Sequence, residues 1–160
     1  MIKSNKDAFL KKVSDVATAL GIPPSWLMDV MYLESGFNEK AVNGIGATGL
    51  IQFTKTTATN LGYTTGDLLL MTNVQQMDVV KSYFERAFKS YGKAYSFDDL
   101  YCLVFYPPWK ASGDGAALPS SMYAGNSSFD INGDGKVTKG EFFDVIYKRL
   151  GRKKKVLNCL

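Results

Sequence analysis

The sequence predicts a mainly helical protein, and three observations support this fold class. Apolar residues recur at intervals of three and four along most of the chain, which is the spacing of one helix face. Glycine or proline follows most of these segments, as expected at helix ends. We see no convincing strand longer than a few residues. With 160 residues, 46% of them hydrophobic, the chain can form one substantial core, and we expect a single domain over residues 1–160.

In the first half of the chain, three helices are expected. Residues 5–20 carry an amphipathic pattern that Gly21 ends. Two prolines then precede a second helix over residues 25–35, because proline favours the first turn of a helix. A loop rich in glycine and asparagine follows over residues 36–49, and a Thr-rich helix is expected near residues 55–61.

In the second half, the longest helix is expected over residues 74–91. Residues 97–106 are apolar on most sides and predict a central helix that the following prolines terminate. Residues 110–128 lack periodicity and predict a loop. The final helix is expected to end near Leu150, after which residues 151–160 form a basic tail.

The chain contains no histidine, which restricts the chemistry it can perform. Catalysis by Ser-His-Asp or Cys-His groups and zinc sites with histidine ligands are excluded. Carboxylate chemistry remains. Glu34 is the leading candidate, because Leu27, Val30 and Met31 precede it by seven, four and three positions and place it on the apolar face of its helix. We expect desolvation there to raise the pKa of the carboxyl group, as a general acid requires, although a helix-end carboxylate that reaches solvent is the alternative.

The segment from Glu34 to Phe53, ESGFNEKAVNGIGATGLIQF, resembles the lytic transglycosylase and goose-type lysozyme family. That family has a Glu-Ser pair at a helix end, a loop with Ala-Val and Gly-Ala, and a Gly-Leu-Met-Gln segment. The resemblance implies a lysozyme-like helical fold and cleavage of the MurNAc-GlcNAc β-1,4 bond of peptidoglycan. It also implies that Glu34 is the sole catalytic acid/base. The residues that align with the family pattern without a gap are Glu34, Ser35, Phe37, Asn38, Ala41, Val42, Gly46, Ala47, Gly49, Leu50 and Gln52, and Thr57 and Ala58 continue the alignment.

The same resemblance implies a set of sugar-binding residues. Gln52 and Phe53 would line the glycan cleft, next to Ser35, and Tyr106 resembles the tyrosine of the family's third motif. Asn43 stands where many relatives carry a serine near the reacting sugar. The sequence departs from the family pattern at Ile51, where methionine is usual, and after Tyr106, where Pro107, Pro108 and Trp109 replace Asn-Ala-Gly.

The choice between transglycosylase and hydrolase depends on a second carboxylate. An inverting hydrolase needs one at about 6.5 to 9.5 Å from the acid, and a retaining hydrolase needs one closer. Glu39, Asp98 and Asp99 are the candidates, but the first lies in a predicted loop and the Asp pair is typical of a helix N-terminus. In a lytic transglycosylase the 6-hydroxyl of the sugar attacks instead. We therefore favour that route and keep a hydrolytic lysozyme open.

Residues 130–141, DINGDGKVTKGE, match an EF-hand calcium loop. A structural Ca²⁺ is expected there, although the same residues also make good turn and helix-capping chemistry. The expected ligands, including the backbone carbonyl of Lys136 and a direct or water-mediated contact from Thr138, are Asp130, Asn132, Asp134, Lys136, Thr138 and Glu141.

Aromatic residues make up 13% of the chain, and Trp109 and Tyr123 fall in predicted turns or loops where sugar rings could stack. The net charge of +4 suits an anionic polymer, and peptidoglycan is the expected partner. Because the excess positive charge is concentrated in residues 148–155 without a recognition motif, we expect no nucleic-acid partner.

No apolar run is long enough to span a bilayer, and the first 20 residues lack the core of a signal peptide. We expect no stable membrane insertion. Action in the cell wall or periplasm would then require delivery by a phage virion, a holin-type pore or another assembly. The rival hypothesis is a non-catalytic, calcium-stabilised wall-binding or structural module of a phage tail.

Overall fold

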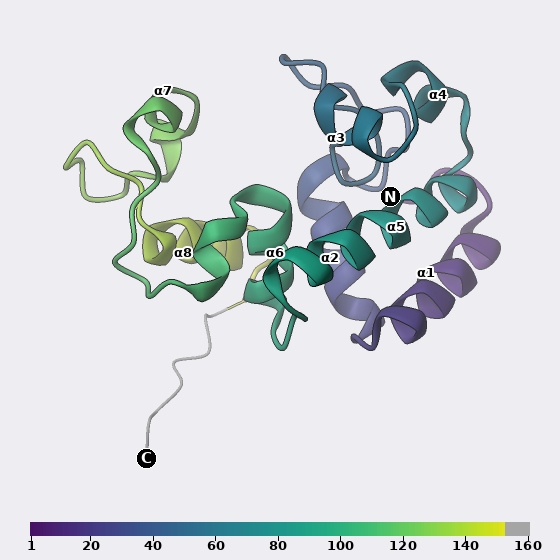
Figure 1. Ribbon diagram of the computed structural model, residues 1–160, viewed down its shortest axis with the longest axis horizontal. Helices are drawn as coiled ribbons and strands as arrows, with labels where there is room; N and C mark the ends of the chain where they lie inside the picture. Colours follow the sequence, from purple (N-terminus) through teal and green to yellow (C-terminus); the bar gives the residue numbers. More distant parts are fainter. Residues whose placement is uncertain (153–160) are drawn as a thin grey trace. The chain divides into compact units, whose positions relative to one another are not determined.

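The structure of the chain is a computed structural model, and it describes residues 1–152 (Figure 1). The prediction of a mainly helical fold is confirmed, since the described residues form no strand and only isolated β-bridges. The chain divides into two compact units, Met1–Val104 and Phe105–Leu160. A single lysozyme-like domain over residues 1–160 stays a prediction. Most of the basic tail, residues 153–160, lies outside the described residues.

In the first unit, helix α1 (Lys6–Leu20) packs against α2 (Pro24–Ser35) and α5 (Asn73–Tyr91). The predicted apolar faces are the buried ones, and side chains such as Phe9 and Val13 on α1 are almost completely buried. Gly21 ends α1 in the left-handed conformation, with φ of 69°, which glycine adopts without steric cost. The three helices therefore form the frame on which the following loop rests.

Two shorter helices, α3 (Lys55–Asn60) and α4 (Thr65–Leu70), come between α2 and α5 in the sequence. Sequence periodicity predicted α3 but missed α4, because six residues are too few to show a repeating pattern. The missed signal was a capping box, in which Thr64 and Asp67 each accept a hydrogen bond from the other's backbone N–H. Those bonds also lower the pKa of Asp67, which keeps its carboxylate charged.

Helix α6 (Phe97–Phe105) is the apolar helix expected at residues 97–106. It ends one residue early because Tyr106, which precedes a proline, adopts an extended conformation with φ of −152°. Leu100, Cys102 and Leu103 are completely buried. The helix therefore supplies core residues, as predicted.

The second unit contains α8 (Lys139–Arg149) and several short helices that the sequence did not predict. Residues 110–128, expected to be a loop, include parts of η1 (Pro107–Ala111) and η3 (Ser127–Phe129), and between them η2 (Ser120–Met122) and α7 (Tyr123–Asn126). Elements of three to five residues show no helical repeat, which is why the pattern missed them. The core of this unit is aromatic, with Phe105 stacked on Phe142 at 4.1 Å between ring centroids.

Within residues 1–152, no helix combines the length and the apolar character needed to cross a membrane.

Candidate active site

Glu34 lies in the last turn of α2, where the sequence placed it. Gly36, with φ of 60°, terminates the helix two residues later and turns the chain into the following loop. Leu27, Val30 and Met31 are each 0% exposed, so the face that carries Glu34 is the buried face of the helix. Glu34 itself is half-buried. Glu34 is therefore partly covered by protein and partly accessible to solvent.

Tyr101 of α6 donates a hydrogen bond from its hydroxyl to Oε1 of Glu34 at 2.6 Å. The sequence analysis treated this tyrosine as part of an apolar helix and gave it no role at the site. Its ring is 4% exposed, and a buried tyrosine hydroxyl requires a hydrogen-bond partner, which was the available signal. Tyr101 follows Glu34 by 67 positions in the sequence, so this bond orients the carboxylate from a distant helix.

Tyr83 of α5 is a second tyrosine near Glu34. Burial raises its pKa to about 12, and electrostatic interactions with Tyr91 and Glu34 add to the shift. Its hydroxyl donates a hydrogen bond to the backbone carbonyl of Leu103. Tyr83 therefore stays a neutral phenol beside the carboxylate at physiological pH.

The loop from Gly36 to Phe53 is held against the end of α2 by side-chain hydrogen bonds. The hydroxyl of Ser35 lies 2.9 Å from the carbonyl of Leu50 and 3.1 Å from that of Met31. Asn43 accepts hydrogen bonds at Oδ1 from the backbone N–H groups of Ile45 and Ala47. Both residues, predicted to bind sugar, therefore shape the loop in this structure, and their contact with sugar stays a prediction.

Gln52 adopts the left-handed conformation, with φ of 56°, which is uncommon outside glycine. Its amide nitrogen donates to the carbonyls of Ala41, at 3.3 Å, and Gly49, at 3.0 Å. Gln52 also lines a small cavity of about 40 Å³ with Thr54, Thr57 and Tyr83. Strained residues cluster at functional sites, and this one lies in the segment predicted to contact the glycan.

Gln76 of α5 is a buried polar residue that the sequence analysis did not identify. Its Oε1 accepts a hydrogen bond from the backbone N–H of Leu50 at 3.0 Å. Its Nε2 donates to the carbonyls of Glu39, at 2.7 Å, and Leu68, at 2.9 Å. The side chain thus connects both ends of the loop to α4. Gly49 is required beside it, because a Cβ there would lie 2.5 Å from Gln76 Oε1.

The aromatic residues predicted to bind sugar occupy different environments. Phe53 is 2% exposed and lies edge-on to Tyr83, so it presents almost no ring face to solvent. Trp109 is 1% exposed, and its indole N–H has no hydrogen-bond partner among the residues that the structure describes. Tyr106 and Tyr123 are half-buried, and like Trp109 they belong to the second unit. Sugar contacts of these residues stay predictions.

One candidate for a second carboxylate has a structural role. Asp99 Oδ2 accepts a hydrogen bond from the backbone N–H of Tyr95 at 2.9 Å, and the backbone N–H of Asp99 donates to Ser96 Oγ. These bonds cap the start of α6, as the sequence suggested.

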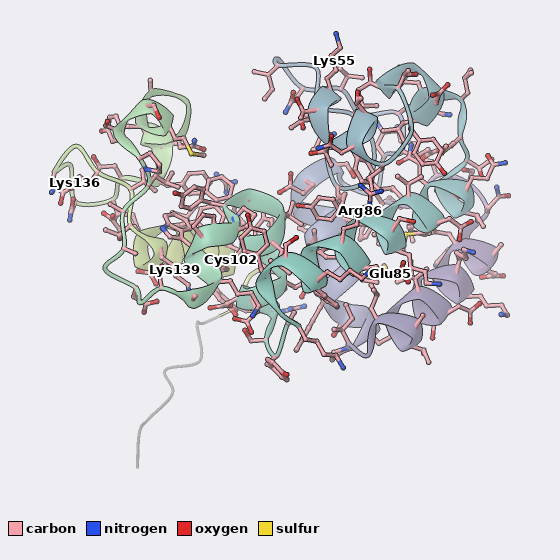
Figure 2. The ribbon with its side chains drawn as sticks, viewed as in Figure 1. Lys55, Glu85, Arg86, Cys102, Lys136 and Lys139 are labelled. Carbon is pink, nitrogen blue, oxygen red and sulfur yellow. The ribbon has the colours of Figure 1, made fainter. Side chains whose placement is uncertain are left out.

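The predicted calcium loop forms a series of tight turns before α8, and Lys136 lies on its exposed part (Figure 2). The two carboxylate oxygens of Asp130 accept hydrogen bonds from the backbone N–H groups of Gly133, Asp134 and Gly135. Burial alone would raise the pKa of Asp130, but these bonds and one from the hydroxyl of Tyr123 lower it.

Glu141, the expected bidentate ligand, turns its carboxylate toward protein donors. Oε1 accepts from the backbone N–H groups of Ile131 and Asn132, and Oε2 accepts from the N–H and hydroxyl of Thr138. Hydrogen bonds, led by that from the Thr138 N–H, lower the pKa of Glu141. Within residues 1–152, no three or more Asp, Glu, Cys or His side chains are grouped closely enough to hold a metal ion.

The family model of the transglycosylase SLT domain matches residues 13–104, which is more than half of the chain. The match includes Glu34, the loop with Gln52, and Tyr101, whereas the predicted calcium loop lies outside it. Enzymes of this family are lytic transglycosylases, which act on peptidoglycan. The chain therefore belongs to the transglycosylase SLT domain family.

Proposed function

We propose that the chain cleaves the β-1,4 bond between MurNAc and GlcNAc in peptidoglycan, with Glu34 as its single catalytic acid/base. The observation that supports this proposal is the environment of Glu34. Glu34 is half-buried at the end of α2, and the hydroxyl of Tyr101 orients its carboxylate through a hydrogen bond of 2.6 Å. The strained Gln52 belongs to the loop that Ser35 attaches to the end of the same helix.

In the proposed reaction, protonated Glu34 donates its proton to the glycosidic oxygen as the bond to the anomeric carbon breaks. The resulting carboxylate then accepts the proton of the 6-hydroxyl of the MurNAc residue, whose oxygen attacks the anomeric carbon. The products are a 1,6-anhydro MurNAc end and a free 4-hydroxyl on the GlcNAc. Glu34 returns to its protonated form, so one carboxyl group is sufficient.

Tyr101 acts as a positioning residue in this proposal. Its hydroxyl stays protonated through the cycle and holds Oε1 in place while the carboxyl group exchanges its proton. A hydrogen bond to a charged acceptor contributes about 1.5 to 3 kcal/mol, so it is strongest when Glu34 is ionised. Tyr101 would therefore favour the step in which the carboxylate has formed.

Product analysis tests the reaction type. Purified peptidoglycan digested by the enzyme is expected to release fragments with 1,6-anhydro MurNAc ends, which mass spectrometry separates from reducing ends by the mass of one water. Reducing MurNAc ends without any anhydro product would contradict the transglycosylase route and indicate a hydrolytic lysozyme. Binding to the wall without release of fragments would instead favour a non-catalytic module.

We also propose that the loop of residues 130–141 binds a structural Ca²⁺. The order of oxygen-bearing residues in the loop supports this. Asp130, Asn132, Asp134 and Glu141 would supply side-chain oxygens, Lys136 a backbone carbonyl, and Thr138 a direct or water-mediated contact. Since Glu141 now accepts bonds from protein donors, calcium binding would require it to exchange them for the ion.

We propose further that the protein reaches the wall through a phage virion or a holin-type pore. The family supports this in one respect, because its enzymes act on peptidoglycan and the chain must meet the wall to reach that substrate. Mass spectrometry of purified virions would detect the chain if it is a virion component. Its absence from virions, with release from cells only when a pore protein is expressed, would indicate the second route.

A further inference from the structure

The ammonium of Lys139, the first residue of α8, lies against a turn of the second unit (Figure 2). Its Nζ donates hydrogen bonds to two backbone carbonyls, those of Trp109 and Ser112, at 2.8 Å each. A lysine ammonium has three N–H donors and a full positive charge, so both bonds are charge-assisted. The side chain therefore connects α8 to the end of η1, about 30 positions earlier in the sequence.

The turn that receives this ammonium is closed by its own hydrogen bonds. The backbone N–H of Ser112 donates to the carbonyl of Trp109 at 3.0 Å, and the hydroxyl of Ser112 donates to the carbonyl of Pro108 at 3.1 Å. The closed turn brings the carbonyls of Trp109 and Ser112 within reach of one nitrogen atom. Backbone carbonyl oxygens are also ligands with which proteins bind small cations, so the turn has the oxygens of a cation site.

Main-chain contacts fix the start of α8 beside the same segment. The backbone N–H of Lys139 donates to the carbonyl of Ala116 at 2.9 Å, and that of Gly140 donates to the carbonyl of Asp114 at 2.8 Å. A Cβ on Gly140 would lie 3.2 Å from that carbonyl oxygen, so the close approach favours glycine. Because the backbone of Lys139 is held in place, its side chain starts from a fixed point, which reduces the entropy lost in ordering it.

The ammonium contacts a part of the turn that water reaches poorly. Trp109 is 1% exposed, and its ring lies 5.8 Å from that of Phe105 and 5.6 Å from that of Phe142, measured between centroids. Removing the ammonium would take one partner from each of the two carbonyls. We therefore expect its loss to loosen the turn and expose Trp109.

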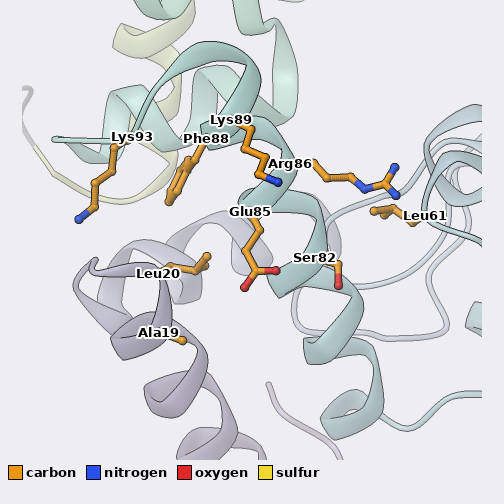
Figure 3. Close-up of a pocket in the computed structure, with 9 residues that line it drawn as sticks. All are labelled: Ala19, Leu20, Leu61, Ser82, Glu85, Arg86, Phe88, Lys89 and Lys93. Carbon is orange, nitrogen blue, oxygen red and sulfur yellow. The ribbon is translucent and has the colours of Figure 1, made fainter.

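The cations around a cavity of about 770 Å³ in the first unit do not converge in this way. The cavity lies between α1 and α5, and Arg86, Lys89 and Lys93 are among the residues that line it (Figure 3). These three side chains point in different directions, and Arg86 donates a hydrogen bond to the carbonyl of Asn60 (Figure 3). Lys139 differs because its ammonium meets two carbonyls of one turn.

We propose that the turn of residues 109–112 is a cation site that the protein fills with its own Lys139 ammonium. When the lysine stem is absent, the site takes a small primary alkylammonium ion. The distances select this chemistry, because 2.8 Å is typical of a charged N–H donor, whereas Ca²⁺ binds oxygens at about 2.3 to 2.6 Å. The turn that carries Trp109 is thus ordered by a cation that cannot dissociate.

Chemical rescue of Lys139→Ala tests the proposal. This substitution deletes the atoms of one propylammonium ion. Thermal melts are followed by the fluorescence of Trp109 in a Trp26→Phe background, since Trp26 is the other tryptophan of the chain, and a chelator is present throughout. Lys139→Ala should lower the midpoint by about 4 to 10 °C, the size expected for charged hydrogen bonds. Propylammonium at 100 mM should restore at least half of that loss, while tetramethylammonium, which has the charge but no N–H donor, should not.

Three further variants separate the ammonium from general packing. Lys139→Met keeps an apolar stem, so it should melt early and not respond to propylammonium. Lys139→Arg keeps a charged donor and should melt above Lys139→Met. Lys136→Ala, which removes an exposed lysine side chain nearby, should leave the midpoint unchanged.

Two results would overturn the inference. One is a Lys139→Ala midpoint within about 1 °C of that of the parent protein. The other is a loss that propylammonium and tetramethylammonium restore equally, or not at all. Because the melts involve neither cell-wall cleavage nor calcium, such a failure would leave the proposed function intact.

Discussion

Replacing Gln76 with leucine should destabilise the first unit by about 1 to 4 kcal/mol. The change removes three hydrogen bonds, to the N–H of Leu50 and the carbonyls of Glu39 and Leu68. The carbonyl of Leu68 keeps the N–H of Met71 as a partner, so two backbone groups lose theirs, at about 1 to 3 kcal/mol each, and the added apolar burial of leucine returns about 1 to 2 kcal/mol. Such a loss is a large part of the 5 to 15 kcal/mol that typically stabilises a domain.

Urea unfolding, followed by circular dichroism, measures this change. Gln75→Leu is the matched control, because Gln75 is the exposed neighbour and only accepts a hydrogen bond from the N–H of Thr72 in a capping box. Its replacement should cost about 1 kcal/mol. A loss below 1 kcal/mol for Gln76→Leu, or an equal loss for the two variants, would refute the assignment of Gln76 as the residue that connects the loop to α4 and α5.

Three further predictions concern the site and the calcium loop. Tyr101→Phe should lower kcat by about 10- to 100-fold with little change in KM, because it removes a hydrogen bond to Glu34 of about 1.5 to 3 kcal/mol. Steady-state kinetics on soluble glycan fragments would measure this effect, and an unchanged kcat would contradict it. Tyr83 has a folded-state pKa of about 12, above its ordinary value of 10, so its contribution to stability is complete below pH 10 and is lost as the pH rises toward 12. Wild type should therefore lose more stability than Tyr83→Phe between pH 9 and 11.5 in urea unfolding, and parallel losses would refute this. Calcium should raise the melting midpoint of wild type and of Asp144→Asn, whose side chain is exposed outside the loop, but not that of Glu141→Gln. A wild-type midpoint that is the same with calcium and with chelator would exclude the proposed ion.

Much of the fold could be predicted because the apolar residues of long amphipathic helices repeat with the helical period. The buried face of α2, with Leu27, Val30 and Met31, lies where the spacing put it. Helix α4 and the short helices between residues 107 and 129 were missed since they span six residues or fewer. A capping box at Thr64 and Asp67 was the only local sign of α4.

The candidate site was predictable only in part, for a different physical reason. Glu34 and the loop after it form one continuous segment that matches a family pattern. Tyr101 and Gln76 act on that segment from distant helices, and their spacing predicts nothing more than burial. A tyrosine in an apolar helix and a glutamine in a long helix become informative only when tertiary contacts supply the partners of their polar atoms.

Glu34→Gln measures the central claim most directly. The substitution keeps the size of the side chain and an acceptor for the Tyr101 hydroxyl, but it removes the proton that the reaction needs. For this variant, clearing of purified cell walls should fall to below about 1% of the wild-type rate, as expected when the only acid/base is lost. The control variant Glu39→Gln, in the neighbouring loop, should clear walls at the wild-type rate. Equal clearing by wild type and Glu34→Gln would contradict the claim that this carboxyl group carries out the reaction.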